Sequence, residues 1–507
     1  MDDLILIKTD LNKYAWNILP PKNGMEGRVR LLAGGEIVQD VLNRYFKGFQ
    51  TLFFAINADL SSPTSTENVI RAARDAWIRL RYLVPTIASL VVVDGNDTPS
   101  LQYYSPSESG VQEWADETFV VHREPHPIDL RALRRKLGII KVPSELGHQT
   151  WMHLSFHDTD TVSSIGFMLH THHSPFDGSA VKILTNVYLK EFAKALGGEK
   201  VAEGLNWGAE VDNLLPAAFN VMLSTEPNPE IQSFMLLILI IAQDTYNLKP
   251  RSGDPGWPVT CREELAFSKQ ESELFMQKLK GPSQSYTVTH AAHAALVMVN
   301  IFDNPPTQEL ASKSISCEFI VNSRRHLQAP YSNRDGYPGY ALSVMPHGFP
   351  LKMFLSQSGE VQPLDKGMLV MLMQHARTIY DELKKMPVAL SFMIPTSDIF
   401  SSLLKQLAAT DTPENSFRVS HDGPGETFID HTFMDSSNNE ICTVTKFFTS
   451  VNRTDPGPFF RVSSWGGIIE LGADYNSNII SQDDVKAYLQ KWKEFMMLVN
   501  TFDSQDY

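Results

Sequence analysis

The stretch SIGFMLHTHHSPFDGSAVKILTNVYLKEFAKAL, residues 164–196, changes its hydrophobic period half-way along. Between 165 and 169, apolar residues alternate with small or polar ones, which is the pattern of a half-buried strand. Between 180 and 192, apolar residues recur every three or four positions, which is the spacing of a helix. The stretch therefore predicts a strand, a short polar turn at 172–178 and a helix.

The turn begins with two histidines, of which His173 is placed to act as a base. A strand-to-helix junction presents side chains at the edge of a sheet, where an imidazole can be desolvated on one side and still reach a substrate. An imidazole titrates near neutrality, and it can remove a proton from a hydroxyl or amine as that group attacks a carbonyl carbon. Such assistance increases a rate by roughly 10²–10⁴-fold. We therefore predict that His173 is a general base.

Two further residues of the turn, Asp177 and Gly178, lie where the helix begins. A carboxylate near a helix N-terminus is stabilised by the free N–H groups and by the helix dipole. From its position alone, Asp177 caps the helix, pairs with an arginine or orients His173. Gly178 permits a backbone geometry or a close approach that a β-carbon would obstruct.

The heptapeptide HHSPFDG at 172–178 resembles the HHxxxDG signature of a known superfamily. That superfamily contains chloramphenicol acetyltransferase, the plant-type BAHD acyltransferases and the condensation domains of peptide synthetases. Within it, this chain is most similar to fungal secondary-metabolite O-acyltransferases. The resemblance implies that His173 is the general base, and that Asp177 is held by an arginine and turned away from the substrate. It also implies structural roles for His172 and Gly178.

Two other interpretations of the motif are open. A histidine-rich strand end can be polar surface, because short motifs often match by chance. Alternatively, His170 and His172 share a strand face, and Asp177 follows at a spacing that resembles cupin metal sites. A cupin site would need another strand where the helical pattern starts at Gly178, and the sequence offers no evident third ligand in another His–Glu cluster. We therefore predict no metal site.

The C-terminal half contains a second stretch that resembles the superfamily. Plant-type members begin their second domain with a strand that ends in an arginine, followed by a proline-containing loop and a Gly–aromatic pair. In this chain Arg324, Pro330, Gly339 and Tyr340 match that arrangement. The resemblance makes Arg324 the predicted partner of Asp177.

A third stretch, RVSSWGG at 461–467, resembles the C-terminal signature in which a hydroxyl–Ser–Trp triplet precedes DFGWG. Here that pentapeptide is replaced by DYNSN at 474–478, which is a departure from the plant type. The hydroxyl position falls on Ser463, where a donor could stabilise an oxyanion, although a serine on a strand surface fits the position equally well. The predicted catalytic set is His173, Asp177 and Ser463, and the predicted structural residues of the site are His172, Gly178, Arg324 and Trp465.

The length of 507 residues favours two domains. We predict an N-terminal domain at 1–205, a crossover segment at 206–258 and a C-terminal domain at 259–507. The resemblance implies that both domains are chloramphenicol-acetyltransferase-like α/β units, that is, α+β two-layer sandwiches, with an active-site tunnel between them.

Hydrophobic patterning predicts elements on either side of the central stretch. In the N-terminal half it predicts a strand at 51–60, a following helix capped by Thr64 and Glu67, and strands at 91–93, 118–121 and 151–156. In the C-terminal half it predicts helices at 264–280, 285–299, 367–385 and 483–500, and strands at 315–321, 427–433 and 441–449.

Composition argues against several classes of partner. A net charge of −14 repels phosphate backbones, so we expect no nucleic acid. Three widely separated cysteines indicate a reducing compartment, and the N-terminus MDDLILIKTD has acid where a secretory signal has base. The longest apolar run, at 234–242, is far shorter than the roughly 20 residues of a membrane span, and we expect it in a buried helix. We predict a cytoplasmic monomer without a membrane span.

Together the motif and the resemblance predict an acyltransferase. An acyl group, most simply acetyl, would move from acyl-CoA to a hydroxyl, or less favourably an amine, of a small apolar metabolite, with direct attack and no acyl-enzyme. Acyl-CoA is then a co-substrate, and no cofactor is bound permanently. Two alternatives stay open: a condensation-type enzyme that uses a carrier-protein thioester, and a non-acylating member that binds or rearranges a ligand.

Overall fold

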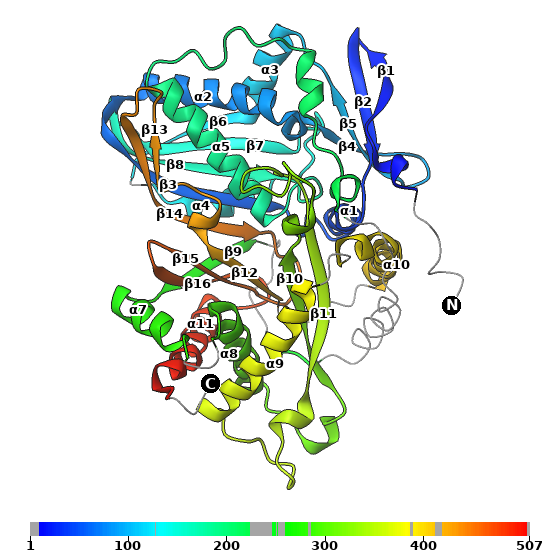
Figure 1. Cartoon of the computed structure of the whole chain (residues 1–507), viewed down its shortest axis with the longest axis vertical. Helices are drawn as coiled ribbons and strands as arrows, with labels where there is room; N and C mark the ends of the chain where they lie inside the picture. Colours follow the sequence, from blue (N-terminus) through cyan, green and yellow to red (C-terminus); the bar gives the residue numbers. More distant parts are fainter. Residues whose placement is uncertain are drawn as a thin grey trace.

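The chain folds into two lobes, each built on its own β-sheet with helices packed against it (Figure 1). The computed structural model describes residues 10–126, 128–223, 246–249, 251, 259–281, 285–385, 389–410 and 418–503. The predicted class, mixed α/β with two sheet-containing units, is confirmed.

A six-stranded sheet forms the centre of the first lobe, in the order β13-β14-β3-β8-β7-β6. In that order its strands span Thr432–Met434, Glu440–Val451, Leu52–Ser65, Thr161–Thr171, Thr150–His157 and Phe119–Glu124. Neighbouring strands are antiparallel except β6 and β7, which are parallel. The strand of the central stretch, β8, thus lies inside the sheet between β3 and β7.

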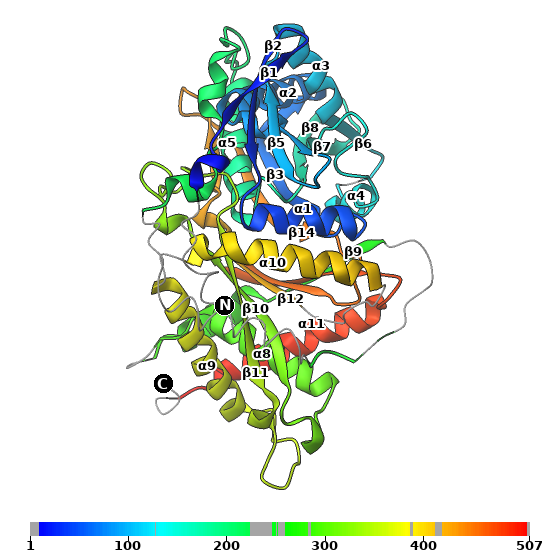
Figure 2. The ribbon, with the colours of Figure 1, turned by 90° about the vertical axis from the view of Figure 1, so that its right-hand side faces the viewer.

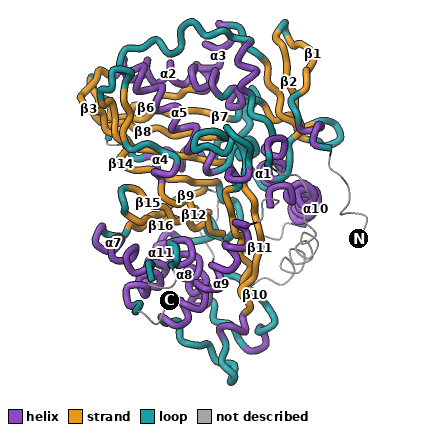
Figure 3. The backbone as a smooth tube through the Cα atoms, viewed as in Figure 1, coloured by secondary structure: helices purple, strands orange, loops and turns teal. Residues whose placement is uncertain are grey.

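Helices cover both faces of this sheet (Figure 3). On one face lie α2 (Thr66–Leu83), α3 (Glu108–Thr118) and α5 (Gly178–Leu196), while α4 (Leu130–Leu137) lies against the other. Alternation along β3 explains the period of two, because Leu52, Phe54 and Ile56 enter the core under α2 and α5. Phe53 and Ala55 point to the opposite side, toward α4.

A smaller antiparallel sheet, in the order β1-β2-β5-β4, extends the first lobe. Its strands span Asn17–Lys22, Met25–Leu31, Pro99–Tyr104 and Leu90–Val93. Helix α1 (Gly35–Tyr45) follows β2 and lies where the two lobes meet (Figure 2).

The second lobe is built on a four-stranded sheet in the order β12-β15-β16-β9. In that order its strands span Arg418–Pro424, Phe459–Trp465, Ile468–Asn476 and Thr260–Ala266. The helices whose apolar residues form the core with this sheet are α7 (Lys269–Lys278), α8 (Val288–Asp303), α9 (Lys366–Lys385) and α11 (Gln482–Met497). A two-stranded ribbon, β10 (Ser314–Asn322) and β11 (Leu342–Pro350), completes the lobe.

Two parts of the C-terminal half connect the lobes. Strand β14 pairs with β3, and β13 pairs with β14, so these two strands complete the sheet of the first lobe. Helix α10 (Ala389–Thr410) packs against α1, as both ribbon views show (Figures 1 and 2). The boundaries 1–205, 206–258 and 259–507 stay a prediction, but the C-terminal half is not confined to the second lobe.

Most of the predicted elements are confirmed, with ends that differ by a few residues. The confirmed strands are those predicted at 51–60, 91–93, 118–121, 151–156, 315–321 and 441–449, and the confirmed helices those at 285–299, 367–385 and 483–500. No helix in the described ranges is both long and apolar enough to cross a membrane.

Three local predictions are wrong in part. Thr64 does not cap α2, because β3 continues through Ser65, which holds the N-cap position. The helix predicted from 264 begins only at Lys269, since 264–266 belong to β9 and Ser268 forms a capping box with Glu271. The strand predicted at 427–433 is confined to Thr432–Met434. The apolar run at 234–242 lies outside the described residues.

Candidate active site

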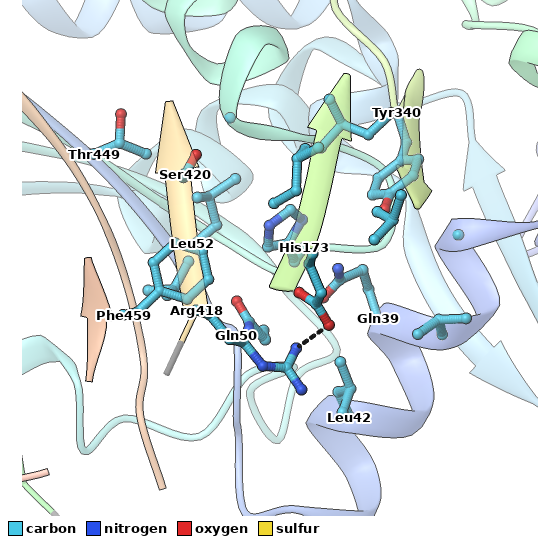
Figure 4. Close-up of a pocket in the computed structure, with 18 of the residues that line it drawn as sticks. Gln39, Leu42, Gln50, Leu52, His173, Tyr340, Arg418, Ser420, Thr449 and Phe459 are labelled. Carbon is cyan, nitrogen blue, oxygen red and sulfur yellow. Dashed lines mark ion pairs between the residues drawn. The ribbon is translucent and has the colours of Figure 1, made fainter. Parts of the chain in front are cut away.

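A cavity of about 190 Å³ lies between the two lobes (Figure 4). Its wall combines α1, β3 and α5 with α10 and with strands β10, β11, β12, β14 and β15, so both lobes contribute. In Figure 4, His173 lies between Gln39 and Leu42 of α1 on one side and Ser420 and Thr449 on the other. A concave site between lobes with a few convergent polar groups is a common place for a small-molecule ligand.

His173 lies just after β8, in the turn that leads into α5, and its side chain contributes to the cavity wall. Its ring lies 6.1 Å from the ring of Tyr340 between centroids. Burial lowers the pKa of the imidazole to about 4, although backbone groups of His173 and Phe176 and the charge of Asp177 act in the opposite direction. The imidazole is therefore neutral at neutral pH, which is the form that accepts a proton.

Asp177 is completely buried and serves as both N-cap and ion-pair partner. Its Oδ1 accepts hydrogen bonds from the backbone N–H groups of Ser179 at 2.9 Å and Ala180 at 2.7 Å, and from Nη2 of Arg324 at 2.9 Å. Its Oδ2 accepts from the N–H of Ala341 at 2.8 Å. The predicted contact between Asp177 and Arg324 is therefore present. Donors on both oxygens favour a structural role, and participation of Asp177 in catalysis stays a prediction.

Arg324 connects the turn to the second lobe. Its Nε donates to the carbonyl oxygen of Tyr337 at 2.8 Å, and its Nη2 also donates to the carbonyl oxygen of Gly339. Its Nη1 donates to Oδ1 of Asn322 at 3.2 Å. One buried guanidinium thereby joins β10, the loop before β11 and the start of α5, which holds the lobes together beside His173.

The other two residues of the motif have different roles from each other. His172 is buried, and its Nδ1 accepts a hydrogen bond from the N–H of Ser174 at 3.1 Å, which stabilises the turn. Gly178 has an ordinary backbone conformation, and a β-carbon there would meet only Cγ2 of Thr449, at 4.0 Å. The predicted reasons for a glycine, unusual geometry or close approach, are therefore wrong. Gly178 lines the cavity, so its missing side chain leaves that space open.

The C-terminal motif residues are more distant from the cavity. Ser463 is half-buried on β15, two residues beyond Arg461, and does not belong to the described residues that line the cavity. Its predicted role as oxyanion donor stays a prediction. The Nε1 of Trp465 donates to the carbonyl oxygen of Val444 at 3.1 Å, and its ring stacks on His431 at 5.4 Å. These contacts favour a structural role for Trp465, which stays a prediction.

Sequence reasoning missed a group of polar residues on the cavity wall. They are Lys182, Ser420, Asp422, Thr449 and Arg461. Lys182 follows Gly178 by one helical turn, so the helical period alone could have placed it on the same face. Nothing local marks the others, because β12, β14 and β15 reach the cavity only through tertiary packing.

His170 and His172 do not form a metal site with Asp177. The His170 ring is stacked between Phe53, at 4.4 Å, and Trp151, at 5.3 Å. Across the ranges that the structure describes, no three His, Cys, Asp or Glu side chains are arranged to hold a metal ion.

Comparison with protein families identifies the chain's relatives. The model of the family described as 15-O-acetyltransferase Tri3 matches residues 45–394, which is more than half of the chain. The chain belongs to the 15-O-acetyltransferase Tri3 family. This membership confirms the predicted relationship to O-acyltransferases of secondary metabolism.

Two fungal proteins illustrate the relationship in sequence. The acetyltransferase pigO of Monascus ruber is 23% identical over 325 residues, which cover 61% of this chain and 64%, just under two thirds, of pigO. The trichothecene 15-O-acetyltransferase TRI3 of Fusarium sporotrichioides is 21% identical over an alignment that covers 96% of each protein.

Solved structures show that this Tri3-family chain shares its fold with TRI3 and with a condensation domain. The structure of TRI3 from Fusarium sporotrichioides has a TM-score of 0.81 at 18% identity and covers 97% of this chain and 98% of its own. The starter condensation domain of the rhizomide synthetase RzmA has a TM-score of 0.56 at 11% identity, with coverage of 94% and 95%. The two-lobed condensation-domain-like fold predicted from HHSPFDG is thereby confirmed.

Proposed function

We propose that this Tri3-family protein transfers an acyl group, most simply acetyl, from acyl-CoA to a hydroxyl of a small apolar secondary metabolite. The observation that carries the proposal is His173, whose neutral imidazole lies on a cavity formed by both lobes. Family membership supports O-acylation, and the mainly apolar wall toward α1, α10 and β11 supports an apolar acceptor.

The proposed reaction is a direct attack. His173 takes the proton of the acceptor hydroxyl as the oxygen attacks the thioester carbonyl, and a tetrahedral intermediate forms. The intermediate collapses with loss of the CoA thiolate, which receives the proton from the imidazolium. No acyl-enzyme is needed, and the three cysteines do not occur among the described residues that line the cavity.

The test is acyl transfer by purified protein with acetyl-CoA and a panel of polycyclic alcohols. His173→Ala removes the base and little buried apolar area, so we expect transfer to fall by roughly 10²–10⁴-fold while the protein stays folded and binds CoA. Circular dichroism and CoA binding are the controls. Turnover by this variant close to that of the wild type would refute the mechanism.

The same assay separates the alternatives. Acetyl groups offered on a carrier-protein thioester instead of CoA would be used faster by a condensation-type enzyme. Conversion of a ligand without any thioester would identify a non-acylating member, and transfer to matched amines in preference to alcohols would identify N-acylation. The expected result is CoA-dependent transfer to alcohols.

A further inference from the structure

The cavity has two chemically different ends. Toward α1, α10 and β11 the wall is mainly apolar, with Leu42 and Phe400 among its residues, although Gln39 and Ser397 also belong to it. Toward α5, β12 and β15 the wall is formed by charged side chains, those of Lys182, Asp422 and Arg461. A ligand that fits both ends must itself have an apolar body and at least one polar group.

Lys182, Asp422 and Arg461 form one buried cluster between the lobes, whereas Glu318 and Arg418, which also line the cavity, pair with each other at 3.3 Å. Both carboxylate oxygens of Asp422 accept hydrogen bonds from Nη1 of Arg461, at 3.2 and 3.3 Å. Lys182 donates from Nζ to the backbone carbonyl oxygen of Asp422 at 2.9 Å. The side chains of Lys182, Asp422 and Arg461 are only 2%, 6% and 5% exposed.

Arg461 is fixed by partners behind the cavity wall. Its Nε donates to Oδ2 of Asp474 at 3.2 Å. Oδ1 of Asp474 accepts from Ser450 at 2.6 Å and from Arg262 at 3.4 Å. Arg461 therefore has carboxylate partners at Nε and Nη1, which fix its position, whereas within the described residues no hydrogen bond from its Nη2 is present.

Lys182, on the cavity wall, also keeps unused hydrogen-bonding capacity. Its Nζ is 4.0 Å from Oδ1 of Asp422, which is too long for a hydrogen bond. An ammonium group has three N–H donors, and within the described ranges its one close hydrogen bond goes to the Asp422 carbonyl oxygen. The ring of Phe447, with its centroid 5.6 Å from Nζ, adds only a weak contact. A buried ammonium with unmatched donors is unfavourable, and a ligand oxygen would relieve this cost.

We propose that Lys182 donates a hydrogen bond to an oxygen of the acyl acceptor. The acceptor is then an apolar molecule that carries a carbonyl or carboxylate oxygen besides the hydroxyl that is acylated. This inference rests on the proposed function, because it identifies the molecule at the charged end of the cavity as the acyl acceptor. Lys182 lies on α5, whose N-terminus follows His173, so a molecule held at both ends has its hydroxyl directed toward the base.

The experiment measures equilibrium binding by dialysis. The probes are hydroxy-androstanones with the ketone at different ring positions, each paired with the androstanol that lacks the ketone. For at least one pair, we expect the wild type to bind the ketone roughly 10- to 100-fold more tightly, the effect of one hydrogen bond to a charged donor. Lys182→Met should abolish this preference and leave the affinity for acetyl-CoA unchanged.

Lys190→Met is the matched control. Lys190 lies on the same helix and also pairs with carboxylates, those of Asp335 at 3.0 Å and Asp430 at 3.2 Å, but it does not line the cavity. This variant should keep the ketone preference even if it unfolds at a lower temperature. Lys182→Gln, which retains an N–H donor, provides a second variant in case Lys182→Met folds poorly, and it should keep part of the preference.

Several results would overturn the assignment. One is that the wild type binds both members of every pair equally. Another is a ketone preference that survives in Lys182→Met. A third is a loss of acetyl-CoA affinity in that variant, which would place the lysine in the donor site. Because binding requires no turnover, a wild type that shows the preference but transfers no acyl group would refute the proposed function and not the role of Lys182.

Discussion

At the scale of single residues, the site is organised by buried charged groups that have hydrogen-bond and ion-pair partners. Asp177 has donors on both oxygens, and Arg324 donates to three different segments. These contacts fix the turn in which His173 stands, whereas the imidazole itself is left neutral by burial. The pattern separates a rigid support from a reactive group, which is what a positioned general base requires.

The Asp177–Arg324 pair gives a prediction about coupling. Asp177→Asn and Arg324→Ala should each lower the free energy of unfolding, Arg324→Ala by roughly 3–5 kcal/mol, because removal of one partner leaves the other charge buried. The double variant should be clearly less destabilised than the sum of the two. Urea unfolding of the four proteins measures this coupling. Strict additivity would mean that the 2.9 Å contact makes no energetic contribution.

At the scale of elements, local periodicity predicted what lies close in sequence. The strand, turn and helix around 172–178 follow from a change of period, and β8 and α5 confirm it. The return of β14 to the first sheet and the register of β12 could not be predicted, because pairing between distant strands leaves no local pattern. Ser420 and Thr449 reach the cavity through those pairings, which is why sequence reasoning favoured Ser463 alone.

Strand register also yields a prediction about the oxyanion donor. In the register of β12 and β15, Ser420 lies opposite Arg461, but the Ser420 hydroxyl donates to Asp422 at 3.1 Å. Ser463 lies opposite Gly423, beyond an irregularity in β12. The hydroxyl of Thr449 is buried on the cavity wall, with no hydrogen-bond partner in the described part of the chain. We therefore expect Thr449→Val to lower kcat by up to ~10²–10³, the effect of losing one oxyanion donor.

Ser463→Ala is the comparison variant. A donor that acts only on the oxyanion affects kcat, whereas a side chain that merely lines the acceptor site affects KM. Steady-state kinetics of both variants therefore distinguish the roles. A large fall of kcat in Ser463→Ala, with normal kcat in Thr449→Val, would contradict our expectation and support the role inferred from resemblance.

At the scale of the whole molecule, both lobes bury histidines in their interiors as well as at the cavity. In the first lobe, Nε2 of His122 and Nδ1 of His153 are 3.0 Å apart, and the His153 and His170 rings are stacked at 5.9 Å. In the second lobe, the interior His293 is stacked at 5.4 Å on His421, which lines the cavity. The length of the chain predicted two units, but these clusters depend on which strands and helices become neighbours, and so they were not predictable from local sequence.

These histidines predict a loss of stability in mild acid. Burial lowers the pKa of His170, of His172 and of His421 to about 3, whereas an imidazole in the unfolded chain titrates near 6.5. Well above pH 6.5 both states hold these groups neutral, and pH has no effect through them. As the pH falls below 6.5, the unfolded chain binds protons that the folded chain does not, so each such histidine lowers the free energy of unfolding by up to about 1.4 kcal/mol per pH unit.

Urea unfolding between pH 7.5 and 5 measures the effect, because carboxyl groups with ordinary or lowered pKa values titrate mainly below that window. The matched variant is His170→Phe, which keeps an aromatic ring between Phe53 and Trp151 but cannot bind a proton. Its stability should depend on pH less steeply than that of the wild type, by up to about 1.4 kcal/mol per pH unit below 6.5. If the pH dependence of stability in this variant equalled that of the wild type, His170 would be protonated in the folded protein. Its buried ring would then be stabilised by an opposite charge or by solvent.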